Sequence, residues 1–191
     1  MNASESKEIL QNRCLASARL EINEEAEKCT YAPLKFSKDG WVAVSKINGK
    51  AQVYPVIATR WASHLKSKYL EIVMVANYGY LLGKVNSSCR IANCAKNRSD
   101  QPPVDIIAVL KEIADLDTED LKVRLWESFA RGHKEASGGI VNVAEFEELG
   151  ALMKVGEKPN RPAGEKKGQG GRKAVEVSPQ KNTLKNYFRK A

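Results

Sequence analysis

The pattern of apolar and polar positions divides the chain into a part that can build a core and a part that cannot. Over residues 1–154 apolar side chains recur at helical or strand spacing, whereas glycine, proline, lysine, glutamate and glutamine dominate from Val155 onward. A stretch so poor in apolar groups cannot bury enough surface to offset the entropy lost on ordering. We therefore expect one globular domain over 1–154, a disordered basic linker over 155–177 and a docking segment over 178–191.

The N-terminal third predicts a helix followed by a β-hairpin. Residues 2–28 carry a ragged apolar stripe and close with a Glu-rich run typical of a solvated helix end. Two β-prone runs, 40–47 and 50–57, flank the Asn-Gly pair at 48–49, which favours a type I′ turn. Pro55 cannot donate to a ladder, so the second run is expected at a sheet edge.

The next segment predicts a short helix and a second hairpin. Residues 59–68 have helical spacing, and 69–76 and 80–85 read as two strands around a turn at 77–79. The run 69–76 also fits a continued helix, because periodicity alone does not separate the two. Residues 86–103 predict a polar loop.

The C-terminal half of the domain predicts helices. Residues 104–114 form the first, Asp117 caps a second that is ended by the Gly-Gly pair at 138–139, and Asn142 with Glu145 is a capping box for a third. The expected fold class is therefore α+β. It consists of a small antiparallel sheet of two hairpins, a helical C-terminal half and a disordered basic tail.

Charge concentrates in the tail. The formal net charge is +8, and from Val155 to Ala191 ten Lys and Arg face three acids, while the first 154 residues hold 21 basic and 20 acidic side chains. A basic arm suits phosphates or an acidic protein surface. The same cations fit a split nuclear-import signal, with solvating charge as the alternative. The candidate nucleic-acid contacts in the tail are Lys166, Lys167, Arg172 and Lys173.

A second set of cations lies near two aromatic residues in the domain. Arg90, Lys96 and Arg98 fall in the predicted loop that follows Tyr78 and Tyr80. Stacking combined with positive charge suits single-stranded DNA or RNA. The alternative is a cross-strand aromatic pair beside a solvated loop.

The C-terminus carries an apolar cluster that a solvated tail does not require. One 3₁₀ turn brings Leu184, Tyr187 and Phe188 to the same side as a compact plug. The cluster resembles the PIP box, the peptide that docks on sliding clamps such as PCNA. The glutamine of that pattern falls on Lys181, which predicts weaker docking than the full motif.

The resemblance implies a function in DNA replication or repair, through docking on a sliding clamp in the nucleus. Arg189 and Lys190 would then face an acidic clamp surface. Ser178 starts a Ser-Pro-x-Lys pattern of proline-directed phosphorylation, and a phosphate there is expected to weaken docking. A short amphipathic helix folding back on the domain is the alternative for this segment.

The sequence gives little indication of catalysis or of membrane contact. The two histidines, His64 and His133, belong to no catalytic spacing, and the acids at 115–120 suit a helix start. No window approaches the ~18 apolar residues of a membrane span, and the polar N-terminus lacks a secretory pattern. We expect a non-enzymatic protein with no cofactor. A nucleic-acid-binding structural protein, including a viral one, and a metal-dependent enzyme are the alternatives.

Four cysteines are expected to be free thiols in a reducing compartment. Two of them are a C-x4-C pair, looser than the tight knuckles of zinc ribbons. A four-thiolate zinc site is the alternative, and it would use Cys14, Cys29, Cys89 and Cys94.

Overall fold

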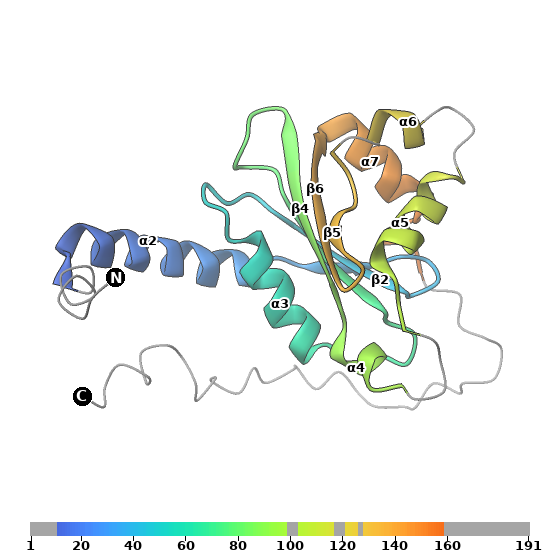
Figure 1. Cartoon of the computed structure of the whole chain (residues 1–191), viewed down its shortest axis with the longest axis horizontal. Coiled ribbons are helices and arrows are strands. Elements are labelled where there is room, and N and C mark those ends of the chain that lie inside the picture. The colour runs from blue at the N-terminus through green and yellow to red at the C-terminus, as the bar shows by residue number, and fades with distance from the viewer. Residues whose placement is uncertain (1–10, 99–102, 117–120, 126–127, 159–191) are drawn as a thin grey trace. The chain divides into compact units, whose positions relative to one another are not determined.

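The computed structural model describes residues 11–98, 103–116, 121–125 and 128–158 (Figure 1). Contacts divide the chain into two units, Met1–Asn160 and Arg161–Ala191, and the second lies outside the described residues. The described elements are α2 (Arg13–Thr30), β1 (Leu34–Phe36), β2 (Val42–Ile47), α3 (Tyr54–His64), β3 (Ile72–Asn77), β4 (Lys84–Ile91), α4 (Asn93–Lys96), α5 (Ile106–Ala114), α6 (Leu121–Leu125), β5 (Arg131–His133), β6 (Ala136–Asn142) and α7 (Val143–Leu152).

The six described strands form one mixed sheet in the order β1-β2-β3-β4-β6-β5. The pair β2–β3 is parallel and the other pairs are antiparallel, so the α+β class is confirmed but the purely antiparallel sheet is wrong. A parallel pair needs a crossover connection, and α3 lies within it. The two edge strands have three residues each, a length that limits edge-to-edge pairing.

Helices cover both faces of the sheet (Figure 1). On one face, Ile57 and Ala58 of α3 share a buried cluster with Val75 of β3 and with the C-terminal end of α2. On the other face, α5, α6 and α7 bury Leu110, Leu121 and Phe146 in the larger cluster. None of the helices in the described part is long and apolar enough to cross a membrane.

The first predicted hairpin is wrong, because α3 replaces its second strand. Proline suits the first helical turn, where its missing N–H has no intrahelical acceptor, and Pro55 lies there. The Asn-Gly pair also has another partner. The backbone N–H of Gly49 donates to Oδ1 of Asn77 at 2.9 Å, and the N–H of Lys50, which would close a two-residue turn, donates to Oε1 of Glu25 at 3.0 Å.

Asn77, at the end of β3, organises both neighbouring connections. Its buried side chain accepts from the N–H of Gly49 and of Gly79, and it donates to the carbonyl of Ala51 at 3.1 Å. Each such bond contributes about 1 kcal/mol net, and losing them would strand buried polar groups at greater cost. A Cβ at Gly79 would lie 2.5 Å from Oδ1 of Asn48, so this turn requires glycine.

The second predicted hairpin is confirmed as β3 and β4, but its second strand is later than expected. β4 spans Lys84–Ile91, so the first third of the predicted loop at 86–103 belongs to a buried interior strand. The polar residues of this segment favoured the prediction of a loop. Asn86, Ser87 and Ser88 are all at most 4% exposed, because β3 and β6 cover both sides of their backbone.

The helical C-terminal half is only partly confirmed. The helices predicted at 104–114 and after Asn142 are present, and the capping box forms, with Asn142 N–H donating to Glu145 Oε2 at 3.1 Å. The Gly-Gly pair at 138–139 does not end a helix. It lies in β6, and the predicted cap Asp117 lies outside the described residues.

The N-terminal helix is confirmed from Arg13 to Thr30, with Asn12 as its cap, and its predicted beginning lies outside the described residues. The Glu-rich end is not fully solvated as predicted. Ala26 and Cys29 are buried, and Glu25 accepts from the N–H of Lys50 at 3.0 Å. This end therefore anchors α2 to the sheet and α3.

We expect Gly139→Ala to destabilise the fold by roughly 1–3 kcal/mol, because overpacking against rigid backbone is costly. The added Cβ would lie 2.5 Å from the carbonyl oxygen of Ser128, which also accepts from Ile140 N–H at 2.9 Å. Urea unfolding measures the change. The matched control is Gly150→Ala in α7, where a Cβ meets nothing within 4 Å.

The control is expected to leave stability unchanged or raise it by up to about 1 kcal/mol, because alanine favours a helix over glycine. Equal midpoints for Gly139→Ala and the unsubstituted protein would contradict this account of the β6 contact.

Candidate nucleic-acid interface

The ladder between β3 and β4 separates the tyrosines from the cations that the sequence grouped together. Asn77 pairs with Asn86 at one end, and Ile72 pairs with Ile91 at the other. Five residue steps of strand span about 17 Å. Tyr78 therefore lies at the opposite end of the hairpin from the segment that carries the cations, and the predicted joint stacking site is wrong.

The two tyrosines stabilise the fold at their own end. The hydroxyl of Tyr78 donates to Oε1 of Glu147 at 2.6 Å, and its ring meets Phe146 edge-on at 5.9 Å. Burial, followed by the bond to Glu147, raises the pKa of Tyr78. Tyr80 accepts from the side-chain amide of Gln52 at 2.9 Å.

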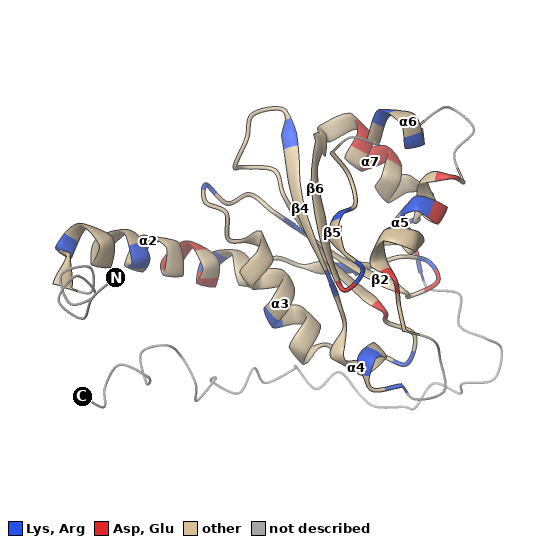
Figure 2. Cartoon of the chain, viewed as in Figure 1, with Lys and Arg blue, Asp and Glu red and all other residues tan. Residues whose placement is uncertain are grey.

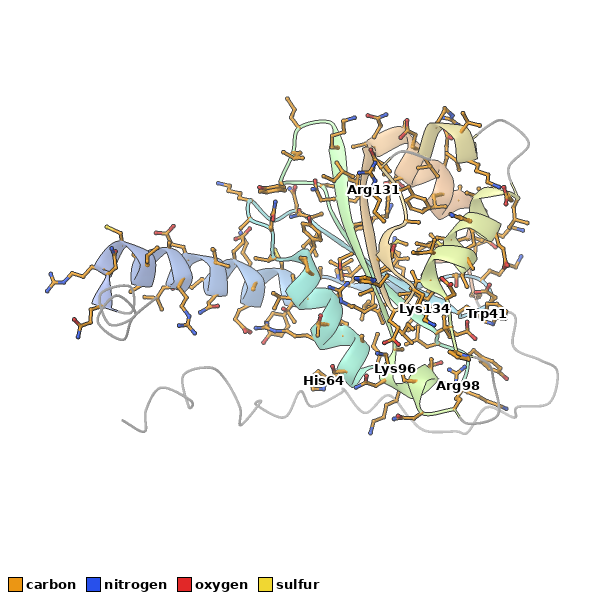
Figure 3. The ribbon with its side chains drawn as sticks, viewed as in Figure 1. Trp41, His64, Lys96, Arg98, Arg131 and Lys134 are labelled. Atoms are coloured by element: carbon orange, nitrogen blue, oxygen red, sulfur yellow. The ribbon has the colours of Figure 1, made fainter. Side chains whose placement is uncertain are left out.

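The cation-bearing end of the hairpin has a different aromatic residue, Trp41. The carbonyl of Trp41 accepts from the N–H groups of Glu71 and Ile72, and the carbonyl of Glu71 accepts from Ala92 N–H at 2.8 Å. These bonds link the start of β2, the start of β3 and the end of β4 at one end of the sheet. Trp41 is 46% exposed, which leaves much of its ring available for stacking (Figure 3).

Arg98 holds this end of the fold together. Its Nη2 donates to the carbonyl of Leu70 at 2.6 Å, and its Nη1 lies 3.8 Å from Oε1 of Glu71. Burial raises the pKa of Glu71, while the charge of Arg98 opposes that rise. Arg98 therefore stabilises the fold at this end, and its positive charge also contributes to the electrostatic potential at the surface.

Arg90 is half-buried in β4, close to that edge. Its Nη1 donates to Ser88 Oγ at 2.9 Å and to the carbonyl of Cys89 at 2.8 Å. Both bonds use the same nitrogen, and a guanidinium carries five N–H donors. Within the described residues no partner is found for its other nitrogens, so they can serve an incoming oxygen ligand.

The turn between β5 and β6 contributes cations that the sequence did not predict. Lys134 is exposed, and its carbonyl accepts from Ile106 N–H at 2.9 Å, which ties the turn to the start of α5. Glu135 pairs with Lys96 at 2.9 Å, and that bond lowers the pKa of Glu135. Arg131 is exposed, and its guanidinium makes no ion pair within the described part of the chain.

A groove of about 590 Å³ lies on the other side of α4. Lys66, Ser67 and Lys68 line it together with Asn93 and Asn97, and no carboxylate in the described part lines it. Its ammonium, hydroxyl and amide groups are donors of the kind that bind phosphate oxygens. We call it the α3–α4 groove.

Five cations at or near the end of the sheet where Trp41 precedes β2 form what we call the basic edge. Residues 90–98 and 131–135 hold five cations and one acid, Glu135 (Figure 2). Of the predicted residues, the structure brings together Arg90, Lys96 and Arg98. With Trp41, the basic edge consists of Arg90, Lys96, Arg98, Arg131 and Lys134, and in Figure 3 Arg131 is the labelled cation of this set that lies farthest from Trp41.

The arrangement offers groups that can bind nucleic acid. Cations and an exposed indole at the same end of a sheet can contact phosphates and stack a base. His64 and His133 are both exposed, at the end of α3 and in β5. Within the described residues, no three His, Cys, Asp or Glu side chains gather into a group that would hold a metal ion.

The other predicted contacts lie outside the described residues. These are the tail cations Lys166, Lys167, Arg172 and Lys173, the phosphorylation candidate Ser178, and the docking residues Lys181, Leu184, Tyr187, Phe188, Arg189 and Lys190. They remain predictions.

The four cysteines occupy different environments, so the four-thiolate zinc site does not form. Cys14 is exposed on α2, Cys29 and Cys89 are buried, and Cys94 is partly buried in α4. Burial raises the pKa of Cys89 to about 12, with a smaller opposing effect of Arg90. Burial also raises the pKa of Cys29.

We expect iodoacetamide at mildly alkaline pH to modify Cys14 first in the folded protein, because the thiolate is the nucleophile and Cys14 alone is fully exposed among the cysteines. Cys89 should react only after unfolding. Peptide mass spectrometry with time measures both rates. Modification of Cys89 as fast as Cys14 would contradict the burial of β4.

No protein-family model matches the chain, and no curated protein matches its sequence. Similar solved structures include the C-Ala domain from Aquifex aeolicus alanyl-tRNA synthetase, with 13% identity and a TM-score of 0.41 over 64% of this chain and 95% of that one. Another is PggH, a pGpG-specific phosphodiesterase from Vibrio cholerae, with 13% identity and a TM-score of 0.38 over 78% of this chain and 44% of that one. These likenesses are too distant to carry a conclusion about function.

Proposed function

We propose that this protein is a non-enzymatic accessory factor that binds nucleic acid, DNA or RNA, through the basic edge. One observation carries the proposal: Lys96, Arg98 and Lys134 lie at the end of the sheet where the exposed Trp41 precedes β2, and Arg90 and Arg131 lie near that end on β4 and β5. Phosphate contacts supply affinity without sequence preference. An exposed indole can in addition stack on a base, provided that the nucleic acid is single-stranded. Single-stranded nucleic acid is therefore the preferred ligand.

The path of the strand follows from the two surfaces beside α4. Asn93 of this short helix lines the α3–α4 groove, and Lys96, on its last turn, pairs with Glu135 beside Lys134. A backbone that runs over α4 would meet Lys66 and Lys68 on one side and the basic edge on the other. Such a path uses phosphate contacts at both ends and stacking on Trp41.

We expect Arg131→Ala with Lys134→Ala to weaken binding of a labelled single-stranded oligonucleotide. Losing two phosphate contacts should reduce the slope of log K against log salt by about 1.4, at roughly 0.7 per contact for single strands. Trp41→Ala should cost about 1–3 kcal/mol of binding energy with little change in that slope, because it removes stacking only. Fluorescence anisotropy at several salt concentrations measures both effects.

Lys28→Ala with Lys50→Ala is the matched control, because it removes the same charge from exposed positions near the Asn77 end of β3. An equal loss in this control would show that net charge alone drives binding, against the proposal. Alanine at Lys166, Lys167, Arg172 and Lys173 tests the tail separately. If only the tail variant loses affinity, the basic edge is not the interface.

We propose further that the accessory factor serves DNA replication or repair in the nucleus by docking on a sliding clamp. Support comes from the sequence alone: Leu184, Tyr187 and Phe188 match three positions of the PIP box, next to Arg189 and Lys190. Burying three such side chains contributes ~1.5–3 kcal/mol each before ordering costs. The nucleic-acid surface and the clamp peptide would then act on the same substrate.

We expect calorimetric titration of the full chain with a sliding clamp to give binding that Tyr187→Ala with Phe188→Ala abolishes. Lys181→Gln should tighten it, because the change supplies the amide of the family pattern. Nucleic-acid binding should be unchanged in the aromatic variant. No heat with either the natural chain or Lys181→Gln would end the clamp proposal and favour the alternative, a structural nucleic-acid-binding protein such as a viral one.

A further inference from the structure

Two cations in the α3–α4 groove are not neutralised by an acid. The segments that form the groove, 59–70 and 92–98, hold five Lys and Arg and no acid. Three of the five are paired with carboxylates from outside these segments, as Arg60–Glu27, Lys96–Glu135 and Arg98–Glu71. The other two, Lys66 and Lys68, are exposed and line the groove, and no carboxylate in the described part pairs with them.

The lining also contains neutral polar groups that the fold leaves available. Within the described residues, no hydrogen-bond partner is found for the side chains of Ser67, Asn93 and Asn97. Ser63 is the exception, because its hydroxyl donates to the carbonyl of Thr59 at 2.9 Å. The groove therefore offers two ammonium groups, one hydroxyl and two side-chain amides, and each of these groups can donate to a ligand.

Both walls of the groove are held in place. The carbonyl of Leu70, at the end of the lysine-bearing loop, accepts from Cys94 Sγ at 3.6 Å and from Arg98 Nη2 at 2.6 Å, which ties the loop to α4 and to the segment after it. The ammonium of Lys68 lies 5.5 Å from the centre of the Tyr69 ring. Such a contact holds a cation in position without using its three N–H donors. Donors that are already positioned lose less entropy when a ligand binds.

The charge and the donors of the groove match a phosphate monoester better than a diester. A monoester carries a charge of about −1.5 to −2 at neutral pH and presents three acceptor oxygens. A phosphate inside a strand carries a single charge, so it would leave one of the two ammonium groups unbalanced. The volume of about 590 Å³ lies within the range of ~300–1,000 Å³ that is usual for small-ligand sites.

We infer that the α3–α4 groove binds a phosphate monoester, either the terminal phosphate of a strand or the phosphate of a free mononucleotide. Lys66 and Lys68 balance its charge, and Ser67, Asn93 and Asn97 donate to its oxygens. The strand-end case rests on the proposed function, because a strand bound to the basic edge would then end beside α4. The free-mononucleotide case does not depend on the proposed function.

Competition among unlabelled oligonucleotides tests the strand-end case. Three strands of one sequence, with a 5′-phosphate, with a 3′-phosphate or with hydroxyls at both ends, displace an internally labelled strand from the full chain. We expect one phosphorylated strand to compete about tenfold better than the hydroxyl-ended strand, which is the change that one charge-assisted hydrogen bond can supply. Fluorescence anisotropy measures the ratio, and the preferred end gives the polarity of the strand.

The variant Lys66→Gln with Lys68→Gln is expected to bring this ratio to about one, because it removes both charges from the groove. Lys28→Gln with Lys50→Gln is the matched control, since it removes two exposed cations elsewhere and should keep the ratio. Arg131→Ala with Lys134→Ala should weaken all three strands and also keep the ratio. Circular dichroism should show that these variants stay folded.

Amide NMR spectra of the ¹⁵N-labelled full chain test the free-mononucleotide case without any strand. We expect adenosine 5′-monophosphate or adenosine 3′-monophosphate to shift the amide signals of residues 66–68 and the side-chain amides of Asn93 and Asn97. Adenosine, which lacks the phosphate, should not shift them. The shifts should disappear in the Lys66→Gln, Lys68→Gln variant and persist in the Lys28→Gln, Lys50→Gln control.

The two measurements separate this inference from the proposed function. Shifts with a mononucleotide but no binding of any strand support the groove and contradict the proposed function. Equal competition by all three strands, together with an absence of mononucleotide shifts, overturns the inference and leaves the proposed function in place. An end preference that survives Lys66→Gln with Lys68→Gln also overturns it, because the terminal phosphate would then bind elsewhere.

Discussion

The buried side chain of Asn77 is the constraint from which the arrangement of the sheet follows. It accepts from Gly49 and Gly79 and donates to Ala51, so it holds the exit of β2 and the turn after β3 in one place. The N–H of Lys50, which would close a two-residue hairpin turn, donates to Glu25 instead. The chain continues into α3 and returns as β3, parallel to β2.

That topology determines where the candidate nucleic-acid-binding residues lie. Because β3 runs parallel to β2 and antiparallel to β4, the start of β2 and the end of β4 lie at the same end of the sheet, with the start of β3 between them. Trp41 is therefore at the same end of the sheet as the segment from Arg90 to Arg98. Tyr78 and Tyr80 lie at the opposite end of the β3–β4 hairpin. A surface suited to phosphates and bases thus results from strand order, and the tight Gly-Gly contacts of β6 bring the cations of the β5–β6 turn to the same region.

The two ends of the described fold have different properties. One end is basic and aromatic, with donors that have room for a ligand. The other end carries α2, whose apolar stripe begins in the core and continues into solvent as far as Leu15.

The sequence by itself determined the features that depend on neighbours in the chain. The capping box of Asn142 and Glu145, the helix at 104–114 and most of α2 were predictable, because caps and helical stripes involve residues three or four apart. The charge segregation of the tail and its PIP-box resemblance are also sequence properties, and they remain predictions about residues outside the described part.

Only the tertiary structure decided the rest of the fold and most of the candidate site. The Asn-Gly pair favoured a turn, yet the N–H of Lys50 that would close it donates to Glu25, 25 residues away. Polar Asn86 to Ser88 read as a loop, yet β3 and β6 bury them. Arg90, Lys96 and Arg98 were predictable as cations, but Trp41, Arg131 and Lys134 were not, because their proximity depends on strand pairing between distant segments, which no local pattern encodes.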